Sequence, residues 1–138
     1  MHLLAILMGF LPLARANFPT INGYRYLGCY EETTETLESG ARALNGGKFH
    51  FNTSFTSIGK CTQFCRADNY IYAGLEQSIE CWCSNYLEDD SKRFEDEACD
   101  MACVGDATQM CGGELKLSVY AQEDKHGIEF DERTFRAD

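Results

Sequence analysis

Eight cysteines in a short chain are the feature that most restricts how this sequence can fold. Their spacing gives two Cys-x3-Cys pairs, one Cys-x-Cys pair and two single cysteines, at Cys29, Cys61, Cys65, Cys81, Cys83, Cys99, Cys103 and Cys111. An even number favours four disulfide bonds, and the spacings differ from the paired Cys-x2-Cys knuckles typical of zinc sites. The length of 138 residues suits one small domain, in which such bridges contribute much of the stability.

The first sixteen residues are typical of a secretory signal peptide. Residues 1–16 form an apolar run that ends in Ala14-Arg15-Ala16, the small-x-small pattern that precedes cleavage. We expect cleavage after Ala16 and a secreted mature chain that is not inserted in a membrane. A buried N-terminal helix and an uncleaved anchor are the alternatives, although the run is shorter than the roughly 20 residues of a membrane span. Secretion into an oxidising compartment supports the disulfide interpretation.

A helix is predicted around the first Cys-x3-Cys pair. Thr56 or Ser57 can cap a helix that runs to about Asp68, and in that helix Cys61 and Cys65 share one face. At about 1.5 Å per residue, the two cysteines stand roughly 6 Å apart along the helix.

A strand is predicted around the Cys-x-Cys pair. In residues 79–84 the alternation puts Cys81 and Cys83 on one side and Glu80 and Trp82 on the other. The strand cysteines lie about 6.6 Å apart at about 3.3 Å per residue, which matches the helical pair. Two disulfides should therefore join the helix to this strand, and the residues leave the direction of crossing open.

Other strands and loops follow from alternation and composition. Strands are expected at 24–30, at 70–76, which forms a hairpin with 79–84 through Gln77-Ser78, and at 115–120, with Leu115, Leu117 and Val119 inward.

Three segments are expected to lack strands. Residues 31–56 contain several Gly, Ser, Thr and Asn and are interpreted as mostly loop, with a short helical turn near 39–44. Residues 85–98 are interpreted as an acidic loop, and residues 121–138 as a charged C-terminal tail.

The charge and the polar residues exclude several functions. A formal net charge of −10 and a pI near 4.7 oppose binding to phosphate backbones, so nucleic acid is not an expected partner. The acidic runs 88–90 and 95–97 match no calcium-binding loop and are typical of a solvated surface. Oxidised cysteines cannot act as nucleophiles. We therefore expect a protein that is not an enzyme and uses no cofactor or metal ion.

An ordered set of short motifs is similar to one known family. The motifs are Tyr26-Leu-Gly-Cys-Tyr30, Arg42-Ala-Leu44, Cys61-x3-Cys65, Tyr70-Ile-Tyr-Ala-Gly-Leu-Glu76, Glu80-Cys-Trp-Cys83, Cys99-x3-Cys103, Gly105-Asp106, Gln109-Met-Cys-Gly-Gly113 and Leu117-Ser-Val-Tyr120. Together they resemble the WSC domain, from about Tyr24 to Tyr120. The chain departs from the common pattern at Ser84, where Gly is frequent, and at Ala107, where Pro is frequent.

The resemblance implies a fold, a disulfide pattern and a role. The fold is an α+β, disulfide-rich domain of the PAN/apple kind over residues 24–120, with a helix packed on a short antiparallel sheet. The implied bridges are Cys29–Cys99, Cys61–Cys81, Cys65–Cys83 and Cys103–Cys111. The implied role is that of a secreted, lectin-like module that binds a cell-wall or extracellular polysaccharide, with β-glucan as the leading example. The alternative is an extracellular protein–protein interaction module with no glycan ligand.

Sugar binding directs attention to aromatic and carboxylate side chains on the strands. Aromatic rings stack on the apolar faces of pyranoses, and carboxylates and amides bond to the hydroxyl groups. The candidate residues are Tyr70, Tyr72, Glu76, Glu80, Trp82, Asp106 and Gln109. Four of them have a structural alternative, because Trp82 can instead cover the disulfides in the core, Tyr70 and Tyr72 can likewise be core residues, and Asp106 can cap the turn before Cys111.

The sequence also contains one candidate modification site in the segment expected to be a loop. Asn52-Thr53-Ser54 is an N-glycosylation sequon, which fits a surface loop of a secreted glycoprotein.

Overall fold

The computed structural model describes residues 20–123, and the expected signal peptide and most of the expected C-terminal tail lie outside them. The described elements are β1 (Thr20–Ile21), β2 (Tyr24–Glu31), β3 (Lys48–Phe51), α1 (Ile58–Arg66), β4 (Tyr72–Glu76), β5 (Glu80–Ser84), β6 (Arg93–Phe94), the 3-10 turn η1 (Asp96–Ala98), β7 (Ala102–Cys103), β8 (Asp106–Met110) and β9 (Lys116–Gln122).

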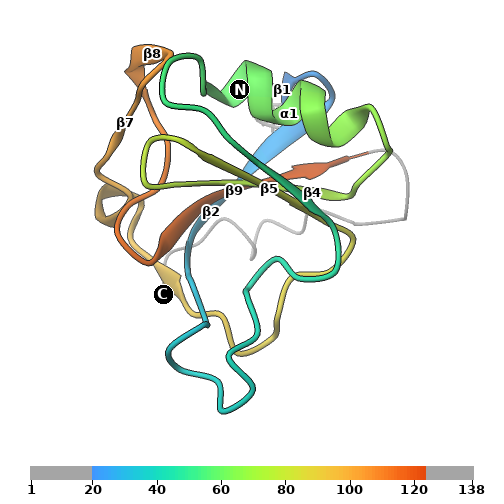
Figure 1. Cartoon of the computed structure of the whole chain (residues 1–138), viewed down its shortest axis with the longest axis vertical. Coiled ribbons are helices and arrows are strands. Elements are labelled where there is room, and N and C mark those ends of the chain that lie inside the picture. Colours follow the sequence, from blue (N-terminus) through green and yellow to red (C-terminus); the bar gives the residue numbers. More distant parts are fainter. Residues whose placement is uncertain (1–19, 124–138) are drawn as a thin grey trace, which may run out of the picture.

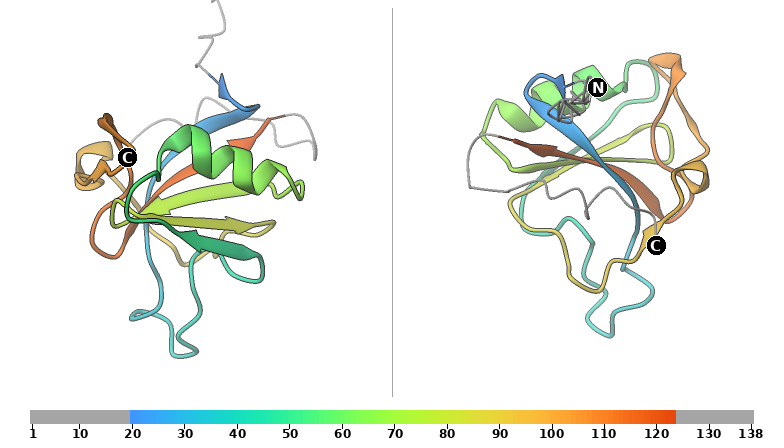
Figure 2. Two further views of the ribbon diagram at one scale, coloured as in Figure 1. Left: turned by 45° about the horizontal axis from the view of Figure 1, so that its top comes forward. Right: turned by 180° about the vertical axis from the view of Figure 1, so that it is seen from behind.

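Most of the described strands belong to one antiparallel sheet. The strand order is β1-β2-β9-β4-β5-β3, with β6 paired to β2, and the separate hairpin β7–β8 lies beside it. The sheet curls into a half-barrel, and α1 crosses one of its faces (Figures 1 and 2). The last strand, β9, lies between β2 and β4, so the two ends of the domain are joined in the middle of the sheet. This arrangement leaves β3 at an edge.

The predicted fold class is wrong. An α+β domain with a helix on a short sheet was expected, whereas the described residues form a mainly β structure with seven strands in the large sheet and one α-helix of nine residues. The helix does lie against the sheet, as expected, but it covers only part of one face. The prediction failed because strands of two to four residues, such as β6 and β3, are too short for an alternating pattern to distinguish them from loops.

Short strands that alternation does not reveal also explain the differences within the segments that were expected to be loops. The segment 31–56 contains β3, and no helical turn forms at 39–44, where Leu44 instead makes a bridge with Leu87. The segment 85–98 contains β6 and η1. The β4–β5 hairpin forms as predicted but has a three-residue loop, in which Gln77 and Ser78 both have positive φ.

The helix α1 has the sequence signals that predicted it. The hydroxyl of Ser57 accepts a hydrogen bond from the backbone N–H of Lys60 and caps the first turn. Cys61 and Cys65 are buried on the face toward the sheet, where their disulfides fasten the helix to the sheet.

The structure contains four disulfide bonds, and no described cysteine is free. They are Cys29–Cys99, Cys61–Cys81, Cys65–Cys83 and Cys103–Cys111, the pairing implied by the resemblance. Two of them join α1 to β5, as the matched spacing of the two pairs indicated. A third joins β2 to the turn after η1, and the fourth closes the β7–β8 hairpin.

The sheet separates two buried clusters. Three of the four disulfides lie among Ile58, Ala73, Leu75 and Tyr120 on the helix side. On the other face the cluster consists of Leu27, Ala43, Leu44, Trp82, Leu117 and Val119. Gly74 makes room for this second cluster, because a Cβ there would lie 2.5 Å from the side chain of Leu44.

Candidate functional site

The edge strand and its neighbour place three aromatic rings on the face away from the helix. In the β3–β5 register Phe49 is opposite Trp82, and Phe51 is opposite Glu80. Side chains of directly opposed residues lie on the same face of a sheet. We call the group formed by Phe49, Phe51 and Trp82 the aromatic platform.

The three rings differ in exposure. Trp82 is only 7% exposed, whereas Phe49 is 56% and Phe51 48% exposed. The centroid of Phe49 lies 4.8 Å from that of Trp82, and the ring of Phe51 meets the indole edge-on at 5.6 Å. Trp82 is therefore the buried base of the platform, and the two phenylalanines form its accessible surface.

Arg42 extends the platform with a cation. Its guanidinium carbon lies 3.8 Å from the ring centroid of Trp82, a cation–π geometry. Its Nη1 donates to Glu32 at 2.9 Å and lies 3.6 Å from a carboxylate oxygen of Glu76. Glu32 is itself fixed, because it accepts the backbone N–H of Ala43 at 2.8 Å. These contacts hold Arg42 in one position over the indole.

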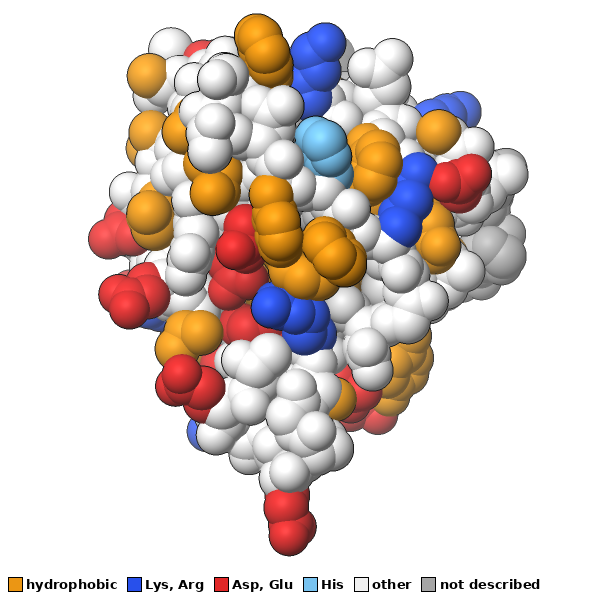
Figure 3. Space-filling model, in the orientation of Figure 1, with side chains coloured by type: hydrophobic (Ala, Val, Ile, Leu, Met, Phe, Trp, Pro, Cys, Tyr) orange, Lys and Arg blue, Asp and Glu red, His pale blue; other side chains and the backbone are white. Residues whose placement is uncertain are grey.

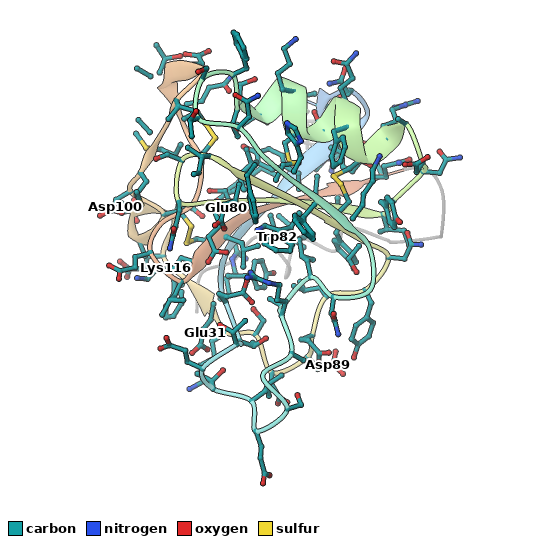
Figure 4. All side chains as sticks on the ribbon, in the orientation of Figure 1. Glu31, Glu80, Trp82, Asp89, Asp100 and Lys116 are labelled. Carbon is teal, nitrogen blue, oxygen red and sulfur yellow. A yellow bond between two sulfur atoms is a disulfide. The ribbon has the colours of Figure 1, made fainter. Side chains whose placement is uncertain are left out.

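Two carboxyl groups lie beside the rings. The indole Nε1 of Trp82 donates to Glu80 at 3.2 Å, and Figure 4 shows these two labelled side chains next to each other at the middle of the sheet. Glu76 is 2% exposed, and burial raises its pKa well above the ordinary value of 4.5. Glu32 and a hydrogen bond with Glu80 raise the pKa further, while Arg42 opposes them. Near neutral pH the carboxyl group of Glu76 is therefore protonated.

A hollow of about 390 Å³ adjoins the platform. Its lining residues are Arg42, Leu44, Asn45, Gly46, Gly47, Lys48, Phe49, Trp82 and Cys83. Figure 3 shows hydrophobic side chains gathered on this face, with acidic and basic groups next to them. The platform and hollow offer an apolar ring surface together with a cation and carboxyl groups.

Four of the seven sequence-predicted residues lie on this one face. The β4–β5 register pairs Tyr72 with Ser84 and Glu76 with Glu80, so Tyr72, Glu76, Glu80 and Trp82 share the side away from the helix. Tyr72 is partly buried against the same cluster as Trp82. The structural alternative for Trp82 is partly realised: it is a core residue, but it lies on the opposite face from the disulfides.

The other three predicted residues lie elsewhere. Tyr70 precedes β4 and packs against the helix-side cluster. Asp106 accepts hydrogen bonds from the N–H and hydroxyl of Thr108, which is a turn role, and Gln109 accepts from the N–H of Ile58 at the start of α1. The structure does not bring these three side chains to the platform.

Sequence reasoning missed the most exposed part of the platform. Phe49 and Phe51 alternate with Lys48 and His50, a period-2 pattern that could have indicated a strand. The two glycines before it and the polar residues around it favoured a loop instead. Arg42 belongs to one of the family motifs, but nothing in the sequence indicates that its guanidinium lies over Trp82.

The arrangement suits binding better than bond cleavage. Glu76 lies opposite Glu80 in the sheet and is only 2% exposed, whereas the two carboxyl groups of a glycosidase both face the substrate. The sulfurs of Cys61, Cys65 and Cys81 lie close together, but all three atoms are engaged in disulfides.

Among residues 20–123, no helix has both the length and the apolar character needed to span a bilayer.

Comparison with known proteins identifies the family. The WSC domain model matches residues 26–113. A protein of Chaetomium globosum named "Putative fungistatic metabolite" is 40% identical over 102 residues, which are 74% of this chain and 44% of that protein. A "WSC domain-containing protein" of Arthroderma benhamiae and Kremen protein 2 of Mus musculus are each 33% identical, over 73% and 75% of this chain. The matched regions are 10% and 21% of those two proteins, so the chain spans less than half the length of these relatives. The chain belongs to the WSC domain family.

Proposed function

We propose that this protein is an extracellular carbohydrate-binding module whose ligand lies on the aromatic platform. The observation that carries the proposal is the pair of exposed rings, Phe49 and Phe51, fixed on a buried tryptophan at the edge of the sheet. Exposed rings held rigidly in this way bind the apolar faces of pyranoses with little loss of side-chain entropy.

Polar groups beside the rings supply the hydrogen bonds that such a ligand requires. Glu80 is partly exposed and accepts a hydrogen bond from Trp82, while Arg42 supplies donors over the ring of Trp82. Groups of both kinds complement sugar hydroxyls, which donate and accept. The proposed activity is binding, and no catalytic role is assigned to the carboxyl groups.

The proposed ligand is a cell-wall polysaccharide such as a β-glucan. Fungal relatives and membership of the WSC family support this class. The four disulfides and the apolar residues 1–16 support secretion of the protein that binds it.

One observation favours a second candidate, an extracellular protein–protein interaction. The exposed rings are phenylalanines, which carry no polar group, and exposed apolar surface often marks a protein interface. Under this alternative the platform would contact a partner protein and no glycan.

Sedimentation with insoluble polysaccharides tests the proposal. The full chain is mixed with β-1,3-glucan, chitin, cellulose or xylan, and the bound fraction is measured for the natural protein and for Phe49→Ala with Phe51→Ala. We expect retention on at least one polymer, weakened about thirtyfold in the double variant, because two stacked aromatic contacts are lost and each is worth about 1 kcal/mol.

Tyr86→Ala is the matched control, since Tyr86 is an exposed aromatic ring, at 50%, outside the platform and the hollow beside it. Trp82→Ala is a poor probe, because removing a buried side chain destabilises the fold itself. Absence of binding to all four polymers, or binding that survives the double substitution, contradicts the proposal and favours the protein-interaction alternative.

A further inference from the structure

A second cavity lies on the other side of the edge strand. It has a volume of about 280 Å³ and lies between β3, the loop that follows it and helix α1. Its lining residues are His50, Asn52, Phe55, Thr56, Lys60, Cys61, Phe64 and Cys81. We call it the helix-side cavity. Successive side chains of a strand point to opposite faces. His50 therefore faces this cavity, while Phe49 and Phe51 lie on the other face, in the platform.

Three of the eight residues that line the helix-side cavity are aromatic. The ring of Phe64 lies 5.5 Å from that of His50, and Phe55 stands 68% exposed. The Cys61–Cys81 disulfide contributes to the inner surface. The cavity is near the lower limit of small-molecule sites, which begin at about 300 Å³. It therefore suits a single ring with an apolar face, such as one pyranose.

Two of the residues that line the cavity, Lys60 and His50, have basic side chains. Lys60 is exposed and forms no ion pair with any residue in the described range. The nearby Lys48 differs, because its ammonium lies over the Phe64 ring and pairs with Asp68 at 2.5 Å. No carboxylate is among the lining residues, although the chain has 22 acidic against 12 basic residues. The cavity thus differs in charge from the protein as a whole.

In the unglycosylated chain, Asn52 adds a further donor. Its Oδ1 is engaged in the turn, where it accepts the backbone N–H groups of Ser54 and Phe55 at 2.8 Å each. Within residues 20–123 the Nδ2 group makes no hydrogen bond. The side-chain amide can therefore donate N–H groups to a ligand, whereas its oxygen is already used in the turn. Ammonium, imidazole and amide donors next to aromatic walls are complementary to an anion carried on an apolar ring.

We infer that the helix-side cavity binds a uronate, a pyranose that carries a carboxylate, as part of an acidic polysaccharide. Its carboxylate bonds to Lys60 and His50, and its apolar face lies on Phe55. This site does not depend on the proposed function, because the backbone of β3 separates it from the platform.

The test uses isothermal titration with a defined probe, a trisaccharide of galacturonic acid. The full chain carries Ser54→Ala, so that Asn52 cannot be glycosylated at the sequon while the backbone N–H of residue 54 is retained. The fully methyl-esterified trisaccharide is the neutral control with the same rings. We expect the acid form to bind at least tenfold more tightly than the ester, since hydrogen bonds to charged groups are the stronger class.

Variants then assign the binding to this cavity. Lys60→Gln should weaken binding on the order of tenfold and Phe55→Ala by a similar factor, whereas Lys92→Gln, at an exposed lysine far along the chain, should leave binding unchanged. Phe49→Ala should also leave it unchanged, which separates this result from the polysaccharide test. Absence of binding, equal binding of the ester, or an affinity unaffected by Lys60→Gln would each overturn the inference.

Discussion

Glu76 shows how one buried residue links stability to pH. Its carboxyl group is almost fully buried beside Glu32, Glu80 and Arg42. Desolvation raises its pKa above 4.5, so the carboxyl group takes up a proton when the chain folds. At a pH below the pKa of Glu76 in the unfolded chain, the proton is bound in both states and the folded state has its full stability. As the pH rises from there toward the higher pKa of Glu76 in the folded protein, stability is progressively lost.

Glu76→Gln should remove this pH dependence. The amide is neutral at every pH, so the free energy of unfolding of the variant should exceed that of the natural protein increasingly above pH 4.5, by on the order of 1 kcal/mol or more at pH 8. Urea unfolding at pH 4 and pH 8 measures the difference. Glu114→Gln, at an exposed position, is the control. Parallel pH profiles for Glu76→Gln and the natural protein would show that Glu76 is ionised in the fold.

At the level of elements, the edge strand β3 determines whether the platform exists. The strand begins directly after Gly47, where the chain passes so close to β5 that a Cβ would lie 1.7 Å from the carbonyl oxygen of Cys83. No side chain fits there without displacing backbone. Glycine at this position therefore allows β3 to pair with β5 and brings Phe49 over Trp82.

Gly47→Ala should displace β3 and weaken the platform. We expect a loss of about 1–3 kcal/mol in the free energy of unfolding, the usual cost of overpacking, together with weaker polysaccharide binding. Gly59→Ala is a matched substitution in α1 where a Cβ meets nothing, and it should be neutral or stabilising by about 0.5 kcal/mol. Denaturant unfolding of both variants provides the comparison. Equal stability of the two would mean that β3 accommodates the methyl group without moving.

At the level of the whole molecule, disulfides close loops of very different length. Cys29–Cys99 spans 70 residues and joins β2 to the far end of the 85–98 segment, whereas Cys103–Cys111 spans 8 residues within one hairpin. In the chain-entropy account, a bridge stabilises by restricting the unfolded chain, and the effect increases with the logarithm of loop length.

Replacing each pair by alanines should therefore have unequal effects. Removing Cys29–Cys99 should cost about 2 kcal/mol more than removing Cys103–Cys111, from the ratio of the two loop lengths. Urea unfolding of the two double variants tests this order. Equal losses would argue that local packing of the bridges outweighs loop entropy, and full reduction of the natural protein should unfold it.

Several features of this protein were determined by local sequence alone. The helix cap at Ser57, the matched cysteine spacings and the alternation in β2, β4, β5 and β9 each depend on residues close together in the chain. For that reason the sequence predicted the helix, four strands, the joining of α1 to β5 and one face shared by Glu80 and Trp82. The ordered motifs added the family, which the comparison confirmed.

The tertiary structure decided the features that depend on distant segments. Alternation tells which side of a strand a residue occupies, but not what covers that side. Only the pairing of β3 with β5 buried Trp82 beneath Phe49 and Phe51, and only packing placed Gln109 at the start of α1. The mainly β architecture likewise arose from strands of two to four residues, whose stability comes from neighbours far along the chain and leaves little trace in their own sequence.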